Sequence, residues 1–270
     1  MAVSEEKSDG MVKPQHTYRL DLEYDGTDFR GWQMQPVERT VQDCLQQAVL
    51  ALFGEDVPVI GAGRTDAGVH AAGQVAHFCV DSFRPIPVVV RALNALLPSD
   101  VRVKDARMAP SDFHARYSAQ WRGYRYRIAY RPLAIGREYC WACPHTLDVP
   151  RMHSAAQRIL GSRRFRAFAH ASEKESHYLS TVYRSEWTDC DPYCEFHIEA
   201  NRFLHGMVRL LVGTFVTIGR GKAESAILEE IFAADDVRKA GPKAPAAGLT
   251  LMTVGYEPWR ERDPLCIRKR

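Results

Sequence analysis

The sequence predicts an α+β protein built from two subdomains, each with the ferredoxin-like order β-α-β-β-α-β and a mainly antiparallel sheet. Two observations lead to this fold class. Segments with strand and helix periodicity follow that order in the first half of the chain, and a looser version follows in the second half. A length of 270 residues is enough for two such units. We expect a flexible tail over residues 1–16, one subdomain over 17–112 and the other over 113–270, with a groove between them.

The first subdomain begins with a predicted strand over residues 17–24, in which every second residue from Tyr18 to Tyr24 is apolar or aromatic. Thr40 has the side chain of a helix N-cap, and apolar residues then recur at helical spacing until Gly54. Short apolar runs and prolines mark the elements that follow. These are strands near 57–61 and 74–80, a helix from Pro87 to Pro98, and a strand over 101–108.

The second subdomain begins with an alternating run over residues 120–130, which places Tyr124 and Tyr126 on one face of a strand. A similar order of elements follows, although the sequence itself does not repeat. The expected elements are a helix over 151–160, strands over 178–189 and 193–200, helices over 203–218 and 223–233, and a strand over 250–256.

The composition describes a folded protein of a reducing compartment. The chain is 46% hydrophobic and 26% charged, which argues against disorder, and its net charge of +3 does not identify a nucleic-acid partner. The first residues lack the apolar core of a signal peptide, and no run approaches the roughly 18 apolar residues of a membrane span. Seven cysteines in a chain of this kind do not predict a disulfide framework. We therefore expect a cytoplasmic protein without a membrane partner.

Arginines and aromatic residues alternate in two short runs, at residues 121–127 and 163–166. Interleaved cations and rings suit a surface that grips phosphates and stacks bases. The same pattern is typical of an amphipathic strand with a solvated arginine face. The pattern alone leaves both interpretations open.

Residues 61–73 form a glycine-rich loop between two predicted strands, and the loop contains Arg64, Asp66 and His70. Four glycines in so short a stretch indicate a sharply bent backbone or the close approach of another molecule. Polar side chains on such a loop often carry function. The alternative is a tight connection in which Asp66 caps a turn.

Arg209 lies in the middle of the strongly apolar helix predicted over residues 203–218, and His205 lies one turn earlier on the same face. An unpaired charge in such a helix is costly, so Arg209 requires an acidic partner or a polar cleft unless it reaches out from a helix rim. A cation beside a buried aspartate would keep that carboxylate ionised. An ionised aspartate can act as a nucleophile or a base.

No metal or nucleotide cofactor is predicted. Cys140 and Cys143 form one CxxC motif near His145, but Cys190 and Cys194 have the wrong spacing to complete a compact zinc site. The glycine patterns of phosphate-binding and dinucleotide-binding loops do not occur. Asp66 is therefore the acid in the most unusual setting.

The motif GRTDAGVHA at residues 63–71 resembles the catalytic signature of the tRNA pseudouridine synthase A family. Other motifs extend the resemblance, in order, over about residues 17–257. They are YDGT and GWQMQ within 24–35, TVQ at 40–42, FHARYSA and YRY within 113–126, FLHGMVR and VG within 203–213, and APAAGL at 244–249.

The resemblance implies the pseudouridine synthase fold with a central RNA-binding cleft. It implies isomerisation of uridine to pseudouridine at positions 38, 39 and 40 of the tRNA anticodon arm, without a metal or organic cofactor. It also implies a homodimer in which each tRNA bridges two subunits. Carried over to this sequence, the family pattern gives the following roles: Asp66 as catalytic nucleophile, Arg209 as its ionic partner, Arg64 to extrude the uridine and fill its place, Tyr124 to stack on the base, and His70, Arg116 and His205 as further substrate contacts.

The chemistry suits these residues. The uracil must leave C1′, rotate and rejoin through C5, and Asp66 could attack C1′, attack C6 or remove a proton from C2′. Two alternatives to the family function remain at this level. One is a relative that modifies other RNA positions, and the other is a non-catalytic RNA-binding module with the same fold.

Overall fold

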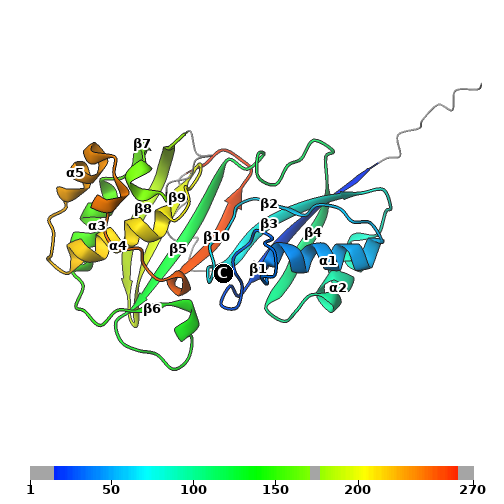
Figure 1. Cartoon of the computed structure of the whole chain (residues 1–270), viewed down its shortest axis with the longest axis horizontal. Coiled ribbons are helices and arrows are strands. Elements are labelled where there is room, and N and C mark those ends of the chain that lie inside the picture. The colour runs from blue at the N-terminus through cyan, green and yellow to red at the C-terminus, as the bar shows by residue number, and fades with distance from the viewer. Residues whose placement is uncertain (1–14, 171–176, 261–270) are drawn as a thin grey trace, which may run out of the picture.

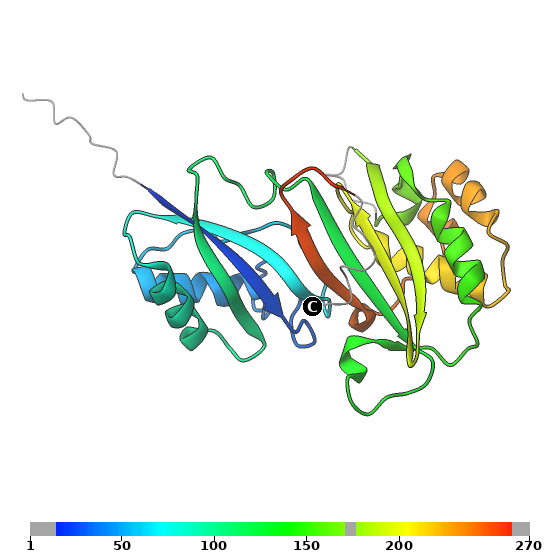
Figure 2. The ribbon, with the colours of Figure 1, turned by 180° about the vertical axis from the view of Figure 1, so that it is seen from behind.

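The structure, a computed structural model, describes residues 15–170 and 177–260. These residues form one continuous sheet of ten strands with the helices on one side (Figure 1). Seen from behind, the strands lie in front of α1, α2 and α4 (Figure 2). The chain therefore has a mixed α+β fold with a mostly antiparallel sheet, as predicted. Within the described ranges, no helix is long and apolar enough to cross a membrane.

The first half of the chain forms one end of the sheet. Its strands follow the order β4-β1-β3, and β2 pairs with β3 on the side away from β1. All of these pairs are antiparallel. This is the ferredoxin-like order predicted from the sequence. The elements are β1 (His16–Tyr24), α1 (Val41–Phe53), β2 (Ile60–Gly61), β3 (His70–Val80), α2 (Ile86–Leu96) and β4 (Val101–Ala109).

The second half repeats this arrangement. Its strands follow the order β10-β5-β9-β8, and β7 extends the sheet beyond β8. The elements are β5 (Trp121–Ala129), β6 (Trp141–Ala142), α3 (Val149–Gln157), β7 (Gly161–Arg164), β8 (Leu179–Cys190), β9 (Tyr193–Ala200), α4 (Met207–Gly219), α5 (Ile227–Ala234) and β10 (Leu249–Gly255). Single 3-10 turns are η1 (Arg137–Tyr139), η2 (Arg166–Phe168), η3 (Val237–Lys239) and η4 (Ala246–Gly248).

The two halves join through β3 and β10, which pair in parallel at Thr250–His70 and Leu251–Ala71. β10 also pairs antiparallel with β5, so the last strand bridges the two halves. Figure 1 shows the helices of each half on either side of this junction. The junction of β3 and β10 therefore lies between the two groups of helices, which cover the same face of the sheet.

Local sequence signals account for α1. The side chain of Thr40 accepts a hydrogen bond from the backbone N–H of Asp43, and Gly54 ends the helix with a left-handed φ of 73°. Val41, Leu45 and Val49 form the buried stripe. Both ends of this helix were predicted from the sequence.

The structure corrects three predicted boundaries. Residues 70–73 of the predicted loop belong to β3, because His70 and Ala71 pair with a strand from the other end of the chain. His205 lies in a turn rather than in a helix, because Gly206 has a left-handed φ of 75° and α4 starts only at Met207. Most of the predicted tail lies outside the described residues, but its last residue, His16, already belongs to β1. The division at residue 112 stays a prediction.

Candidate active site

Asp66 lies in the loop between β2 and β3, and this loop is held firmly by the segment that follows β1. The carbonyl of Thr65 accepts a hydrogen bond from the N–H of Trp32, and the N–H of Gly68 donates to the carbonyl of Phe29. The hydroxyls of Thr65 and Tyr24 are 2.8 Å apart. The loop therefore presents its side chains from a fixed backbone.

Gly31 makes this close packing possible. A Cβ atom at Gly31 would lie 2.6 Å from the carbonyl oxygen of Thr65, and its φ of +94° is one that other residues rarely adopt. Of the glycines inside the loop, Gly63 has open space where a Cβ would lie. Gly26 in the same neighbouring segment is tighter still, since a Cβ there would lie 2.1 Å from the carbonyl oxygen of Val69.

Two cationic side chains and one histidine surround the carboxylate of Asp66. Nη1 of Arg209, at the start of α4, is 3.0 Å from Oδ2. Nζ of Lys243, in the segment between α5 and β10, is 3.2 Å from the same oxygen. Nε2 of His205 is 3.5 Å from Oδ1. The structure thus brings together Asp66 and Arg209, the ion pair that the family resemblance implied, and adds His205 and Lys243 to it.

The charges of this cluster keep Asp66 ionised. Burial alone would raise the pKa of Asp66, but the nearby charges of Lys243, His205 and Arg209 outweigh it and hold the pKa below its ordinary value. Burial and the charge of Lys243 lower the pKa of His170, whose ring lies 5.0 Å from that of His205. Near neutral pH, Asp66 is therefore a carboxylate and His170 an uncharged ring.

Tyr124 on β5 provides an aromatic wall of the site. It is buried and packs edge-on against Phe203, with ring centroids 5.0 Å apart. Burial and the nearby Tyr24 and Asp66 raise the pKa of Tyr124, so its phenol stays protonated. The residue therefore offers an uncharged ring close to the Asp66 carboxylate.

Arg64 and Arg116 lie at the rim. Both residues are exposed, and Arg64 precedes Asp66 by two positions in the loop. The carbonyls of Arg116 and Ala62 both accept hydrogen bonds from Nη2 of Arg122, at 2.7 and 2.9 Å. The segment that carries Arg116 therefore lies beside the start of the Asp66 loop.

His70 is not part of the Asp66 cluster. Its side chain is buried, Nδ1 accepts from the N–H of Gly26 at 3.0 Å, and Nε2 is 3.0 Å from the carbonyl oxygen of Glu138. Nδ1 also lies 3.1 Å from a carboxylate oxygen of Asp25. These contacts hold the end of the loop in place, and the substrate contact expected of His70 from the sequence stays a prediction.

Sequence analysis missed two residues of the site. Lys243 lies in a proline-containing segment without any motif of its own. Arg122 donates to four backbone carbonyls, those of Ala62, Arg116, Ala119 and Asn201, and so ties the Asp66 loop to both halves. The arginine-aromatic run at 121–127 was a signal for Arg122, but not for these contacts.

The other arginines of the two arginine-aromatic runs have structural partners. Nε of Arg127 bonds to the carboxylate of Glu195 on the neighbouring strand β9. Nη1 of Arg163 and Nε of Arg164 pair with Glu229 and Asp235 near α5, at 3.0 and 3.1 Å. For these residues the amphipathic-strand interpretation fits better. In the part of the chain that the structure describes, no cluster of His, Cys, Asp or Glu residues could hold a metal ion.

Comparisons with known proteins agree on one family. A family model described as tRNA pseudouridine synthase matches residues 22–118 and 155–257. A tRNA pseudouridine synthase A of Rippkaea orientalis is 40% identical over 268 residues, covering 95% of this chain and 91% of that protein. One of Xanthobacter autotrophicus is 42% identical over 242 residues, covering 88% and 99%. One of a Thermoanaerobacter species is 39% identical over 237 residues, covering 87% and 97%.

Proposed function

Because this chain belongs to the tRNA pseudouridine synthase family, we propose that it isomerises uridine to pseudouridine at positions 38, 39 and 40 of the tRNA anticodon stem-loop, with Asp66 as the nucleophile. The enzyme is an isomerase that acts on tRNA. The assignment of Asp66 rests on the setting of its carboxylate. The side chain is 20% exposed, and two cations that contact the same oxygen favour its ionised form. A nucleophile needs this combination of charge and access.

The net reaction needs no oxidant or reductant. The C1′–N1 bond breaks with its electron pair on N1, the C1′–C5 bond forms, and the proton lost from C5 is balanced by one gained at N1. Asp66 forms a transient covalent bond by attack on C1′ or C6 and is released when the product forms. The ionised state of Asp66 near neutral pH supports this role.

The surrounding residues receive the flipped base. Taking a uridine out of an RNA stem costs a few kcal/mol, and stacking on an aromatic ring recovers about 1–3 kcal/mol. Tyr124, uncharged and close to Asp66, is the proposed stacking surface. Arg64 and Arg116, both exposed beside the loop, are proposed to contact the RNA backbone, and Arg64 to fill the space that the uridine leaves.

The assembly and its location form part of the same proposal. A tRNA anticodon arm is the substrate, and the enzyme works in the cytoplasm as a homodimer in which each tRNA bridges two subunits. Light scattering during gel filtration measures the dimer directly. A mass equal to one chain at micromolar concentration, with and without tRNA, would contradict it.

The deciding experiment maps pseudouridine on unmodified tRNA transcripts. Wild-type protein and Asp66→Asn are incubated with each transcript, and carbodiimide-treated RNA is read by primer extension. We expect stops at positions 38 to 40 with wild type and none with Asp66→Asn. Product elsewhere would identify a relative that modifies other RNA positions. RNA binding without product on any transcript would identify a non-catalytic RNA-binding module.

A further inference from the structure

Lys243 and Arg209 both contact the same oxygen of Asp66. Nζ of Lys243 lies 3.2 Å and Nη1 of Arg209 lies 3.0 Å from Oδ2. Among residues 15–170 and 177–260, the other oxygen, Oδ1, has only the longer 3.5 Å contact with His205, whose side chain is 63% exposed. The carboxylate is therefore held on one side and open on the other.

The backbone that carries Lys243 is fixed to α4. The N–H of Gly241 donates to the hydroxyl of Thr214 at 2.9 Å. The N–H of Ala244 donates to the carbonyl of Arg209, and Nε of Arg209 donates back to the carbonyl of Ala244 at 2.7 Å. These bonds lie on both sides of Lys243, so the positions of the two cations depend on each other.

Two cations on one oxygen have a specific effect on a carboxylate. Each charge-assisted hydrogen bond restricts rotation of the carboxylate about its Cβ–Cγ bond, because rotation would break both contacts at once. Lys243 and Arg209 repel each other, and the Asp66 carboxylate between them offsets this repulsion. Lys243 is one-quarter exposed and loses less hydration than a fully buried ammonium would.

We infer that Lys243 is a positioning residue for the isomerisation: together with Arg209 it clamps Oδ2 of Asp66 and leaves Oδ1 as the oxygen that meets the uridine. This inference rests on the proposed function. The exposed His205 then gives up its contact with Oδ1 when the nucleotide arrives. The alternative role for a lysine in such a cleft is a direct contact with an RNA phosphate, and the two roles have different kinetic consequences.

The test compares Lys243→Met, Lys243→Arg and the matched control Lys222→Met, which removes an exposed lysine beyond the far end of α4. Single-turnover rates are measured with saturating enzyme, and tRNA dissociation constants at several salt concentrations. We expect Lys243→Met to slow the single-turnover step about tenfold, in proportion to one charged hydrogen bond. Lys243→Arg should restore most of the rate, and Lys222→Met should match wild type.

The affinity measurement separates the two roles of Lys243. A positioning residue leaves the tRNA dissociation constant and its salt dependence unchanged, because no phosphate contact is lost. A phosphate contact would weaken binding and lower the salt slope by about one. That result would overturn the inference, as would a Lys243→Met rate equal to wild type. Thermal unfolding of each variant confirms that the protein is folded.

The inference and the proposed function fail in different ways. If wild type forms no pseudouridine on any tRNA, the proposed function is wrong. If wild type is active and only the Lys243 variants contradict the expected rates, the function stands and the inference alone is wrong.

Discussion

Two carboxylates of this protein have the same kinds of neighbour but different surroundings. Asp66 contacts Arg209, Lys243 and His205, and Glu195 contacts Arg127, Arg125 and His197. The pKa of each lies below its ordinary value, and that of Glu195 falls to about 2, because hydrogen bonds from His197 and Arg127 outweigh its burial. A lowered pKa therefore does not by itself identify the active site.

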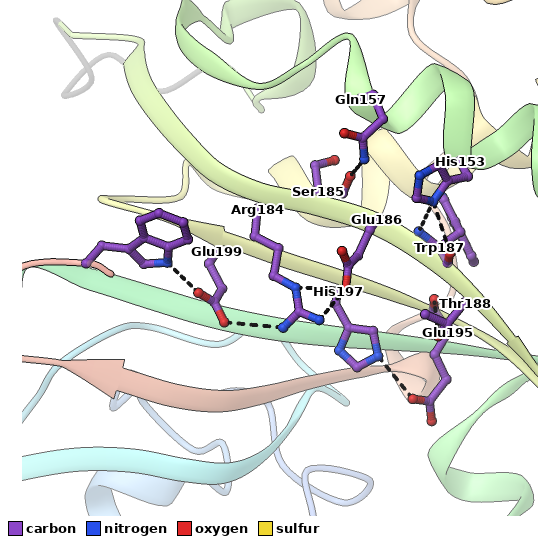
Figure 3. Close-up of polar contacts among 11 residues, drawn as sticks. His153, Gln157, Arg184, Ser185, Glu186, Trp187, Thr188, Glu195, His197 and Glu199 are labelled. Carbon is purple, nitrogen blue, oxygen red and sulfur yellow. Dashed lines mark hydrogen bonds and ion pairs between the residues drawn. The ribbon is translucent and has the colours of Figure 1, made fainter. Parts of the chain in front are cut away.

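The difference lies in how each carboxylate is mounted. Glu195 sits on β9 directly opposite Arg127 on β5, so its ion pair is a cross-strand pair of the sheet. Figure 3 shows the adjoining network, in which Arg184 contacts both Glu186 and Glu199, and Trp259 also bonds to Glu199.

Asp66, by contrast, lies on a loop beside the buried ring of Tyr124, and Arg209, Lys243 and His205 reach it from segments far away in the sequence. No sheet register fixes this carboxylate opposite a partner strand. The comparison teaches that the element carrying a carboxylate, more than its pKa or its kinds of neighbour, separates the proposed nucleophile from a structural acid.

Neutralising the two acids in turn should give the largest contrast. We expect Asp66→Asn to lower the single-turnover rate by at least about 1000-fold, because the nucleophile is removed. Its free energy of unfolding should fall modestly, since the ion pairs that outweigh burial at Asp66 are lost. Primer-extension mapping measures the first quantity and urea unfolding the second.

Glu195→Gln is the matched control for this experiment. It should leave the rate within about twofold of wild type and lower the free energy of unfolding by about 1–3 kcal/mol, because buried arginine contacts lose their charge partner. A large rate loss in Glu195→Gln with normal stability would contradict the assignment of Glu195 to a structural role.

Replacing the arginine partner of each acid should give the same contrast between reaction rate and stability, with a smaller loss of rate. Arg209→Met should slow the single-turnover step about 100-fold with little change in tRNA affinity, because it releases Asp66 and the carbonyl of Ala244. Arg127→Met should affect stability alone. Unchanged turnover in Arg209→Met would show that the ion pair with Asp66 has no part in the reaction.

Substitutions of Tyr124 test whether the aromatic ring beside Asp66 takes part in the reaction. Tyr124→Phe keeps the ring and should retain a rate within about threefold of wild type. Tyr124→Ala removes the stacking surface and should cost about 10- to 100-fold in turnover. Rates are compared in single-turnover assays with both proteins checked for folding. Equal rates for the two variants would rule out stacking.

The smallest effect concerns acid stability. The pKa of Glu195 is lower in the folded protein, about 2 against 4.5, so its stabilising contribution is complete above about pH 4.5 and is lost as the pH falls towards 2. The contribution amounts to about 1–3 kcal/mol. The stability difference between wild type and Glu195→Gln should therefore shrink below pH 4.5. A constant difference down to pH 2.5 would show that charge is not its cause.

Local patterns predicted much of the fold because they are local. The cap at Thr40, the stripe of α1 and the alternation of β1 each depend on a few neighbouring residues, and all three are present. The doubled ferredoxin-like order could be predicted from the sequence of elements alone. No local pattern predicted the pairing of β3 with β10, because the two strands come from different halves of the chain.

The site shows the same limit. Asp66 and Arg209 are 143 residues apart, yet each stood out because its charge was unusual for its surroundings. Lys243 gave no such signal, since a lysine in a polar loop is ordinary. The contacts of His70 could not be predicted from its place in the motif, because its bond to the N–H of Gly26 depends on how β3 packs beside the segment after β1.

The position of β10 in the sequence also has a consequence for the synthesis of the protein. Lys243 and β10, the strand that joins the two halves, follow all the other described strands of the sheet. A polypeptide still emerging from the ribosome can fold its first half, since those strands pair among themselves. The Asp66 cluster is complete only once Lys243 and β10 have been synthesised. A translation product that stops before them carries the signature loop but lacks its finished electrostatic setting.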